Sequence, residues 1–186
     1  ATTVVCGCGG ADAVRAPLPR LLSLAPRLVL DADALNAIAA DASLLALVTA
    51  RTARGLATIL TPHPLEAARL LGSTTAQVQA DRVAAARALA ERSLAVVVLK
   101  GSGTVIAAPD EVPRINATGN ASLASAGTGD VLAGWIGGRW AATARSTIDI
   151  ATRAVVEHGA AAEPERGGAI RAADLIETLH LRARDG

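Results

Sequence analysis

The chain has 186 residues, of which 51% are hydrophobic and only 1% aromatic, so its core must be aliphatic. Its 18 basic and 17 acidic residues leave a net charge of +1, which argues against a nucleic-acid partner, because such proteins need a basic face. Cys6 and Cys8, the two cysteines, lie too close together for a disulfide scaffold or a structural zinc site. No uncharged apolar run reaches the roughly 20 residues of a membrane span. We therefore expect one cytoplasmic domain over residues 1–186 that contacts no membrane.

Short apolar runs alternate with helical segments along the chain. Four runs predict strands: Thr2–Cys6, Arg27–Leu30, Ala57–Leu60 and Leu94–Leu99. Bare apolar runs joined by helical crossovers are typical of a parallel sheet buried on both faces. Gly103–Ala108 follows a Gly-Ser-Gly turn and predicts a hairpin partner for the fourth strand. The expected fold class is α/β, with three α/β/α layers and a mainly parallel sheet.

Helical spacing is clearest over Ala76–Arg92, where Val78, Arg82, Ala85 and Leu89 would share one face. The last third of the chain predicts three more helices: Asp130–Thr143, Ser146–Ala162 and Ala172–Arg184. His158 and His180 fall within these helical patterns and are interpreted as ordinary helix residues.

Each predicted strand ends in a glycine-rich or polar segment. Ligands of open parallel sheets bind at the carboxyl ends of the strands, so these segments predict one shared ligand site. They are Gly7-Cys8-Gly9-Gly10, Asp31-Ala32-Asp33, Thr61-Pro62-His63-Pro64 and Lys100-Gly101. The first lacks the full Gly-x-Gly-x-x-Gly of dinucleotide-binding loops. Helix capping explains one of the two aspartates in the second segment, but not both.

Two segments favour a phosphate ligand. Gly127-Thr128-Gly129-Asp130 precedes an apolar helix, whose N-terminus would attract an anion, and Asp130 could accept a proton there; alternatively, Asp130 is simply a first-turn acid. Lys100 is the single lysine among 18 basic residues and begins Lys100-Gly101-Ser102-Gly103-Thr104. An ammonium with adjacent glycines suits phosphate, although a hairpin turn with one surface lysine is the plainer alternative.

The segment Thr61–Glu66 holds a histidine between two prolines. The prolines fix the turn, and Pro64 can open the next helix at its first position. His63 and Glu66 would then present polar groups at the strand end, which favours a ligand contact over an ordinary loop.

Taken in order, these motifs resemble the ADP/ATP-dependent NAD(P)H-hydrate dehydratases of the ribokinase-like superfamily. The matching motifs are the Gly-rich turn, Asp-Ala-Asp-Ala-Leu-Asn (31–36), Thr-Pro-His-Pro-x-Glu (61–66), Leu-Lys-Gly-x-x-Thr (99–104), Asn-x-Thr-Gly-Asn (116–120) and Gly-Thr-Gly-Asp (127–130). The resemblance covers essentially the whole chain and implies a ribokinase-like fold. Family domains are longer at the amino end, so this chain is expected to be the carboxy-terminal two-thirds of one.

The resemblance also implies a reaction. The family repairs NAD(P)H hydrated at C6 (NADHX or NADPHX): ADP, or ATP, phosphorylates the C6 hydroxyl with Mg²⁺ present, and phosphate then leaves. Asp130 would be the base, and Gly127, Thr128 and Gly129 the anion hole. The nucleotide would lie on Lys100, Gly101, Ser102, Gly103, Thr104 and Gly129. The hydrated dinucleotide would contact Gly9, His63 and Asp130, with Asn120, Asp33 and Glu66 as weaker candidates for substrate or magnesium.

The sequence departs from the family pattern at two positions, since Cys8 stands where proline is common and Leu65 where glycine is common. Both substitutions would crowd the site. Two alternatives stay open: a ribokinase-like kinase of a small alcohol of the hydroxyethylthiazole type, and a non-catalytic nucleotide-binding module. We further expect a homo-oligomer.

Overall fold

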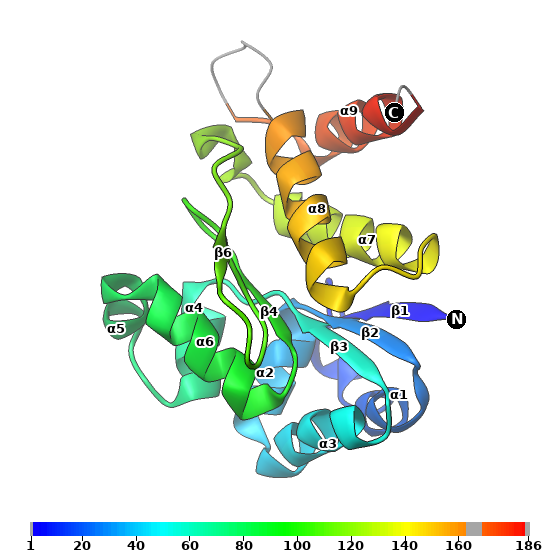
Figure 1. Ribbon diagram of the computed structural model, residues 1–186, viewed down its shortest axis with the longest axis vertical. Helices are drawn as coiled ribbons and strands as arrows, with labels where there is room; N and C mark the ends of the chain where they lie inside the picture. Colours follow the sequence, from blue (N-terminus) through cyan, green and yellow to red (C-terminus); the bar gives the residue numbers. More distant parts are fainter. Residues whose placement is uncertain (1, 163–168, 185–186) are drawn as a thin grey trace.

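The computed structural model describes residues 2–162 and 169–184. Its six-stranded sheet has the order β1-β2-β3-β4-β5-β6 (Figure 1). The strands are β1 (Thr3–Cys6), β2 (Arg27–Leu30), β3 (Ala57–Leu60), β4 (Val96–Leu99), β5 (Val105–Ala107) and β6 (Arg114–Ile115). The first four are parallel, and β5 and β6 continue the sheet in antiparallel fashion. This confirms the expected mainly parallel sheet and the hairpin after the fourth strand; β6 has only two residues and was not predicted.

Helices cover both faces of the sheet and complete the three layers (Figure 1). One face carries α1 (Leu18–Leu24), α2 (Ala32–Ala40), α3 (Ala42–Ala53), α4 (Pro64–Leu71), α5 (Thr75–Ala80) and α6 (Arg82–Ser93). The other face carries α7 (Thr128–Ala141) and α8 (Thr147–Ala161), with α9 (Ala172–Arg184) packed against both. Two short 3-10 turns, Ala11–Val14 and Ala121–Leu123, lie in the connections.

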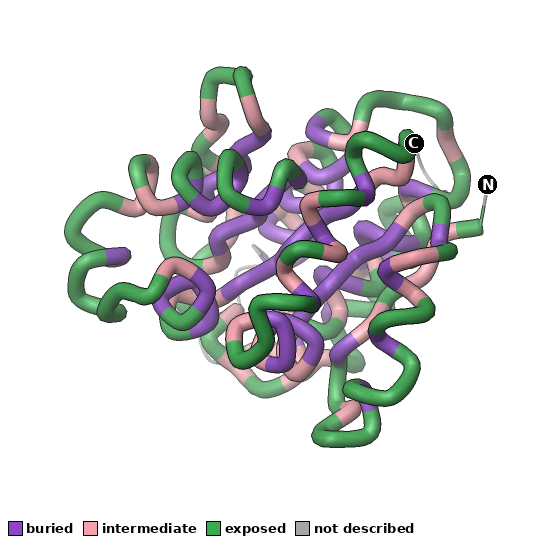
Figure 2. Tube along the Cα trace, turned by 90° about the horizontal axis from the view of Figure 1, so that it is seen from below, coloured by how far each residue is buried: buried purple, intermediate pink, exposed green. Residues whose placement is uncertain are grey.

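The alternating direction of side chains along the strands divides the core into two apolar layers. In β2, Leu28 and Leu30 pack in the layer under α1–α6, whereas Val29 packs in the layer under α7 and α8. Successive side chains of a strand point to opposite faces, so four-residue strands suffice to fill both layers. The buried segments run through the middle of the molecule in Figure 2. The core is aliphatic, as the composition predicts, apart from the buried Trp140.

The prediction of a single helix over Ala76–Arg92 is wrong. The structure has two helices there, α5 and α6, which meet at Asp81. The Asp81 carboxylate accepts a hydrogen bond from the backbone N–H of Ala84 and so begins a new helix. Helical spacing of apolar residues continues across this break, which is why periodicity alone missed it.

The other predicted helices differ from the structure by at most two residues at each end. Within residues 2–162 and 169–184, no single helix is long and apolar enough to cross a membrane; α2 and α3 reach that length only together and meet at 110°.

Candidate functional site

The carboxyl ends of β1 to β4 meet at one edge of the sheet. Backbone hydrogen bonds run from Asp31 N–H to Cys6 O, from Thr61 N–H to Leu30 O and from Lys100 N–H to Pro62 O. Each bond ties the segment after one strand to the neighbouring strand or to the segment that follows it. The four polar segments therefore lie side by side, which confirms the shared edge predicted from topology.

The N-terminus of α7 faces this edge. Its N-cap is Gly127, in the left-handed conformation with φ at 82°, which glycine adopts without steric cost. The Thr128 hydroxyl donates to the carbonyl oxygens of Leu123 and Ser125, at 2.7 and 2.8 Å. These bonds fix the first turn of the helix and place the exposed Asp130 on it. A helix N-terminus carries partial positive charge, so this turn can receive an anion.

Asp31 and Lys100 form an ion pair across the site. Lys100 Nζ lies 2.6 Å from Asp31 Oδ1, and the side chains are 18% and 1% exposed. A methyl group added at Gly129 would lie 3.3 Å from the same Nζ. The ammonium therefore lies between the end of β2 and the first turn of α7.

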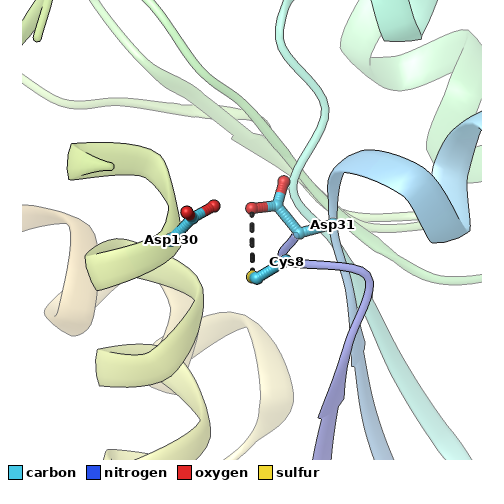
Figure 3. Close-up of side chains that lie close together, drawn as sticks. All are labelled: Cys8, Asp31 and Asp130. Carbon is cyan, nitrogen blue, oxygen red and sulfur yellow. Dashed lines mark hydrogen bonds between the residues drawn. The ribbon is translucent and has the colours of Figure 1, made fainter. Parts of the chain in front are cut away.

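Cys8 completes a group of three acidic and thiol side chains. Ligand atoms of Cys8, Asp31 and Asp130 all lie within 4.8 Å of one another, and the thiol donates to Asp31 Oδ2 at 3.8 Å (Figure 3). Burial raises the pKa of Cys8 to about 12, and the negative charges of Asp31 and Asp130 act in the same direction. The thiol is therefore protonated at neutral pH and is a weak nucleophile.

The carboxylates of this group fit a magnesium ion. Asp31 and Asp130 offer the hard oxygen ligands that Mg²⁺ prefers. The protonated Cys8 sulfur is neither hard nor anionic, so Cys8 does not fit the ion.

A cavity of about 650 Å³ opens beside the Lys100 ammonium. It lies between the β4–β5 turn, the segment 116–124, and helices α7 and α8. Eight of the predicted site residues line it: Lys100, Gly101, Ser102, Gly103, Thr104, Asn120, Thr128 and Gly129. This volume falls in the range of small-molecule and cofactor sites.

The β4–β5 turn has a fixed shape. The Thr104 hydroxyl donates to Gly101 O at 2.9 Å and accepts from Gly101 N–H at 3.3 Å. Arg82, at the start of α6, donates to the carbonyl oxygens of Leu99 and Lys100 at 3.0 and 3.2 Å. Gly101 and Gly103 carry no side chains on this wall of the cavity, so a ligand can approach the backbone closely there.

His158 lines the opposite wall of the cavity and was not predicted as a site residue. Its buried Nε2–H donates to Thr128 O at 2.9 Å, which joins α8 to the first turn of α7. Burial lowers the pKa of His158, and the Lys100 charge adds to this effect. The histidine is therefore neutral at pH 7 and supports the first turn of α7. Its helical position gave no signal of this contact.

His63 and Glu66 cap α4 together. His63 Nδ1 accepts from the backbone N–H groups of Leu65 and Glu66, and Glu66 Oε2 accepts from His63 N–H at 2.8 Å. The other Glu66 oxygen lies 3.1 Å from His63 Nε2. Burial raises the pKa of Glu66, against the opposing effect of the His63 N–H bond. Pro64 is the first residue of α4, as predicted.

The remaining predicted substrate residues also have local partners. Asp33 Oδ2 accepts from Ala11 N–H at 2.7 Å and so holds the Gly-rich turn. Asn120 accepts from Ser122 N–H and donates to Ala162 O. Gly9 has φ at 62°, and no atom lies within 4 Å of where its side chain would begin. Neither Gly9, Asp33, His63, Glu66, Gly127 nor Asp130 lines the cavity; they lie around the sheet edge beside it.

The sequence singled out Asp33 of the two strand-end aspartates, but the buried one at the centre of the site is Asp31. Its signal was available: Asp31 directly follows a buried strand, where a charged side chain must face a partner. Gly7 was also missed; a side chain there would overlap the carbonyl oxygen of Asp31.

Comparison with known proteins identifies the family. The family model described as NAD(P)H-hydrate dehydratase matches residues 4–180. The chain belongs to the NAD(P)H-hydrate dehydratase family. An ADP-dependent (S)-NAD(P)H-hydrate dehydratase from Neisseria meningitidis is 46% identical over 179 residues, which are 95% of this chain and 58% of that protein. The chain thus spans little more than half the length of this relative.

Solved structures agree with this placement. An ADP/ATP-dependent NAD(P)H-hydrate dehydratase from Bacillus subtilis, co-crystallised with ATP and Mg²⁺ and soaked with CoA, is 31% identical with a TM-score of 0.71. That match covers 88% of this chain and 58% of the Bacillus chain. A hydroxyethylthiazole kinase from Pyrococcus horikoshii has a TM-score of 0.72 at 20% identity, over 96% of this chain and 71% of the kinase, and shares the fold alone. A ribokinase-like superfamily protein from Enterococcus faecalis has a TM-score of 0.80 at 22% identity, over 100% of this chain and 63% of that chain, which confirms the expected ribokinase-like α/β fold.

Proposed function

We propose that this chain carries the ADP-dependent dehydration of C6-hydrated NADH or NADPH, which restores the reduced nicotinamide ring. One observation supports this most directly: the Asp130 carboxylate, the Lys100 ammonium and the N-terminus of α7 converge beside a 650 Å³ cavity. A proton acceptor, a point charge and a helix terminus are the parts that phosphoryl transfer to a hydroxyl needs.

Each part has a distinct task in the proposed reaction. The nucleotide lies in the cavity along Lys100–Thr104, with the transferred phosphoryl group at Gly127, Thr128 and Gly129. Asp130 takes the proton from the C6 hydroxyl as its oxygen attacks phosphorus. Phosphate is a far better leaving group than hydroxide. Its departure from C6, together with loss of a proton from C5 to solvent, restores the ring double bond. Gly9, His63, Asp33, Glu66 and Asn120 would surround the dinucleotide, the first four from the sheet edge.

Magnesium would be held by Asp31 and Asp130. One oxygen from each suffices, which leaves the second oxygen of Asp130 for the proton. When bound, the ion would neutralise charge on the phosphates.

The test is to incubate the chain with hydrated NADH, Mg²⁺ and either ADP or ATP, and to follow the absorbance of the reduced nicotinamide. We expect NADH to form with ADP and AMP to accumulate with it. The Neisseria relative serves as the positive control. Nucleotide binding without NADH formation would instead indicate a binding module, and a phosphorylated alcohol released as product would indicate a kinase. Sedimentation of the same sample tests the expected homo-oligomer, and we place the activity in the cytoplasm.

A further inference from the structure

The ion pair of Asp31 with Lys100 joins two strand ends that are not neighbours in the sheet. Asp31 follows β2 and Lys100 follows β4, so the pair spans the end of β3 between them. The Asp31 side chain is only 1% exposed. A buried carboxylate is costly unless a charge or strong donors compensate it, and the ammonium at 2.6 Å does so.

The position of this ammonium is electrostatically unusual. It lies close enough to Gly129 that a methyl group there would sit 3.3 Å from Nζ, and Gly129 is in the first turn of α7. A helix N-terminus is itself partly positive, so it repels the ammonium. With the wide cavity alongside, an unpaired lysine would turn away from the helix.

Holding the Lys100 ammonium near α7 falls to Asp31, and not to the neighbouring carboxylates of Glu66 and Asp130. Glu66 has both oxygens engaged by His63, one by the backbone N–H and one by the ring. Asp130 lies on the exposed side of the α7 turn, and Figure 3 shows it reaching toward Asp31 from the helix.

We propose that Asp31 is a positioning residue: its carboxylate holds the Lys100 ammonium against the N-terminus of α7, where the two positive groups together bind a nucleotide phosphate. The proposal rests on the proposed function only in taking the ligand to be a nucleoside diphosphate. Asp31 acts through Lys100 and needs no contact with the nucleotide.

The first experiment uses the fact that Lys100 is the single lysine of the chain. Labelling lysine with ¹⁵N at Nζ gives one side-chain ammonium signal in NMR spectra. We expect this signal to shift when ADP is added and to shift in Asp31→Asn without ADP. The matched control is Asp174→Asn, an exposed acid in the first turn of α9, which should leave the signal in place. An unchanged signal in Asp31→Asn, or on adding ADP to the wild type, overturns the proposal.

The second experiment is a double-mutant cycle read by calorimetry with ADP in the absence of Mg²⁺, so that the metal-holding role proposed for Asp31 does not contribute. We expect Asp31→Asn and Lys100→Met each to weaken ADP binding roughly tenfold or more, as for loss of a charged hydrogen bond. Adding Asp31→Asn to Lys100→Met should change ADP affinity less than twofold. If the two losses multiply in the double variant, Asp31 acts on ADP binding independently of Lys100, and the proposal is overturned.

Lys100→Met leaves the buried Asp31 carboxylate without its partner, whereas the double variant removes both charges. Thermal unfolding therefore checks each variant first. If Lys100→Met fails to fold, Asp31→Asn is compared with the double variant, and adding Lys100→Met to Asp31→Asn should likewise change ADP affinity less than twofold. Failure of the proposed function has a different signature: ADP binds and the cycle behaves as expected, but no NADH forms.

Discussion

At the scale of single residues, Asp130 is expected to matter for the reaction but not for the stability of the fold. Its side chain is exposed in the first turn of α7, so Asp130→Asn should preserve the fold and the affinity for ADP measured without Mg²⁺. As loss of a general base, it should lower the dehydration rate by about 10²–10⁴-fold. Asp174→Asn, which also changes a first-turn acid, should leave the rate unchanged. Steady-state rates with hydrated NADH measure both, and a near-wild-type rate in Asp130→Asn would refute the proposed mechanism.

Lys100 tests whether a compact cation is required. A guanidinium is larger and planar, and the space between Asp31 and Gly129 is narrow. Lys100→Arg should therefore weaken ADP binding almost as much as Lys100→Ala. The sequence alone predicts little effect on stability, but the ion pair predicts that Lys100→Ala lowers the free energy of unfolding by about 3 kcal/mol, since Asp31 loses its partner.

Calorimetry and urea unfolding measure these two quantities. Arg87→Lys, an exchange on the exposed face of α6, is the matched control and should change neither. Wild-type ADP affinity in Lys100→Arg would show that any cation serves at this position.

His158 predicts how stability depends on pH. Burial lowers its pKa in the folded chain below the ordinary 6.5. The unfolded chain therefore binds a proton at higher pH than the folded chain, and the free energy of unfolding falls as pH drops below about 6.5. This histidine can contribute a slope of up to about 1.4 kcal/mol per pH unit in that window.

Urea unfolding between about pH 7 and pH 5 measures this slope. It should be shallower in His158→Gln than in the wild type, because the variant lacks the buried imidazole. His180→Gln, at an exposed position of α9, should keep the wild-type slope. Equal slopes in all three proteins would exclude His158 as the source.

Lys100, Asp31 and His158 show how much of the candidate site could be predicted from the sequence. Lys100 stood out because every other basic residue is arginine, and its place after a buried strand follows from periodicity. The place of Asp31 directly after a buried strand indicated its burial, but its pairing with Lys100 could not be predicted, because a contact across β3 depends on side-chain reach. Capping accounted for either aspartate equally well. His158 escaped notice for a similar reason, since a helical pattern does not reveal which wall of a cavity a residue faces.

At the scale of elements, α7 carries its glycines for different reasons. A side chain at Gly137 would overlap Val5 of β1, whereas nothing lies within 4 Å of one at Gly134. Gly137→Ala should lower the free energy of unfolding by about 1–3 kcal/mol through overpacking. Gly134→Ala should raise it by roughly 0.5–1 kcal/mol, because alanine favours a helix over glycine. Chemical denaturation of the two variants tests this, and equal effects would mean that α7 does not rest on β1.

Most helices and strands were predictable because the spacing of their apolar residues is unambiguous. The strands β2 and β3 have the predicted bounds, and α9 begins and ends where expected. The break between α5 and α6 was missed because a capping aspartate competes with helix continuation through a side-chain hydrogen bond that periodicity does not detect.

At the scale of the whole molecule, the site draws on segments from residue 7 to residue 159. The parallel topology made their convergence predictable, since strand order and crossover direction place all four ends together. The depth and walls of the cavity were not predictable, because α7 and α8 reach it from the far end of the sequence.

The order of the layers along the chain also bears on synthesis by the ribosome. Helices α1–α6 are made together with the strands they cover, but α7 begins only at Thr128. Until then, Val29, Ile59 and Val98 of the growing sheet lack the cover that α7 and α8 provide. A nascent chain paused before α7 is therefore a strong candidate for chaperone capture or aggregation. Translation speed through the last third of the message would then decide how much of the protein matures.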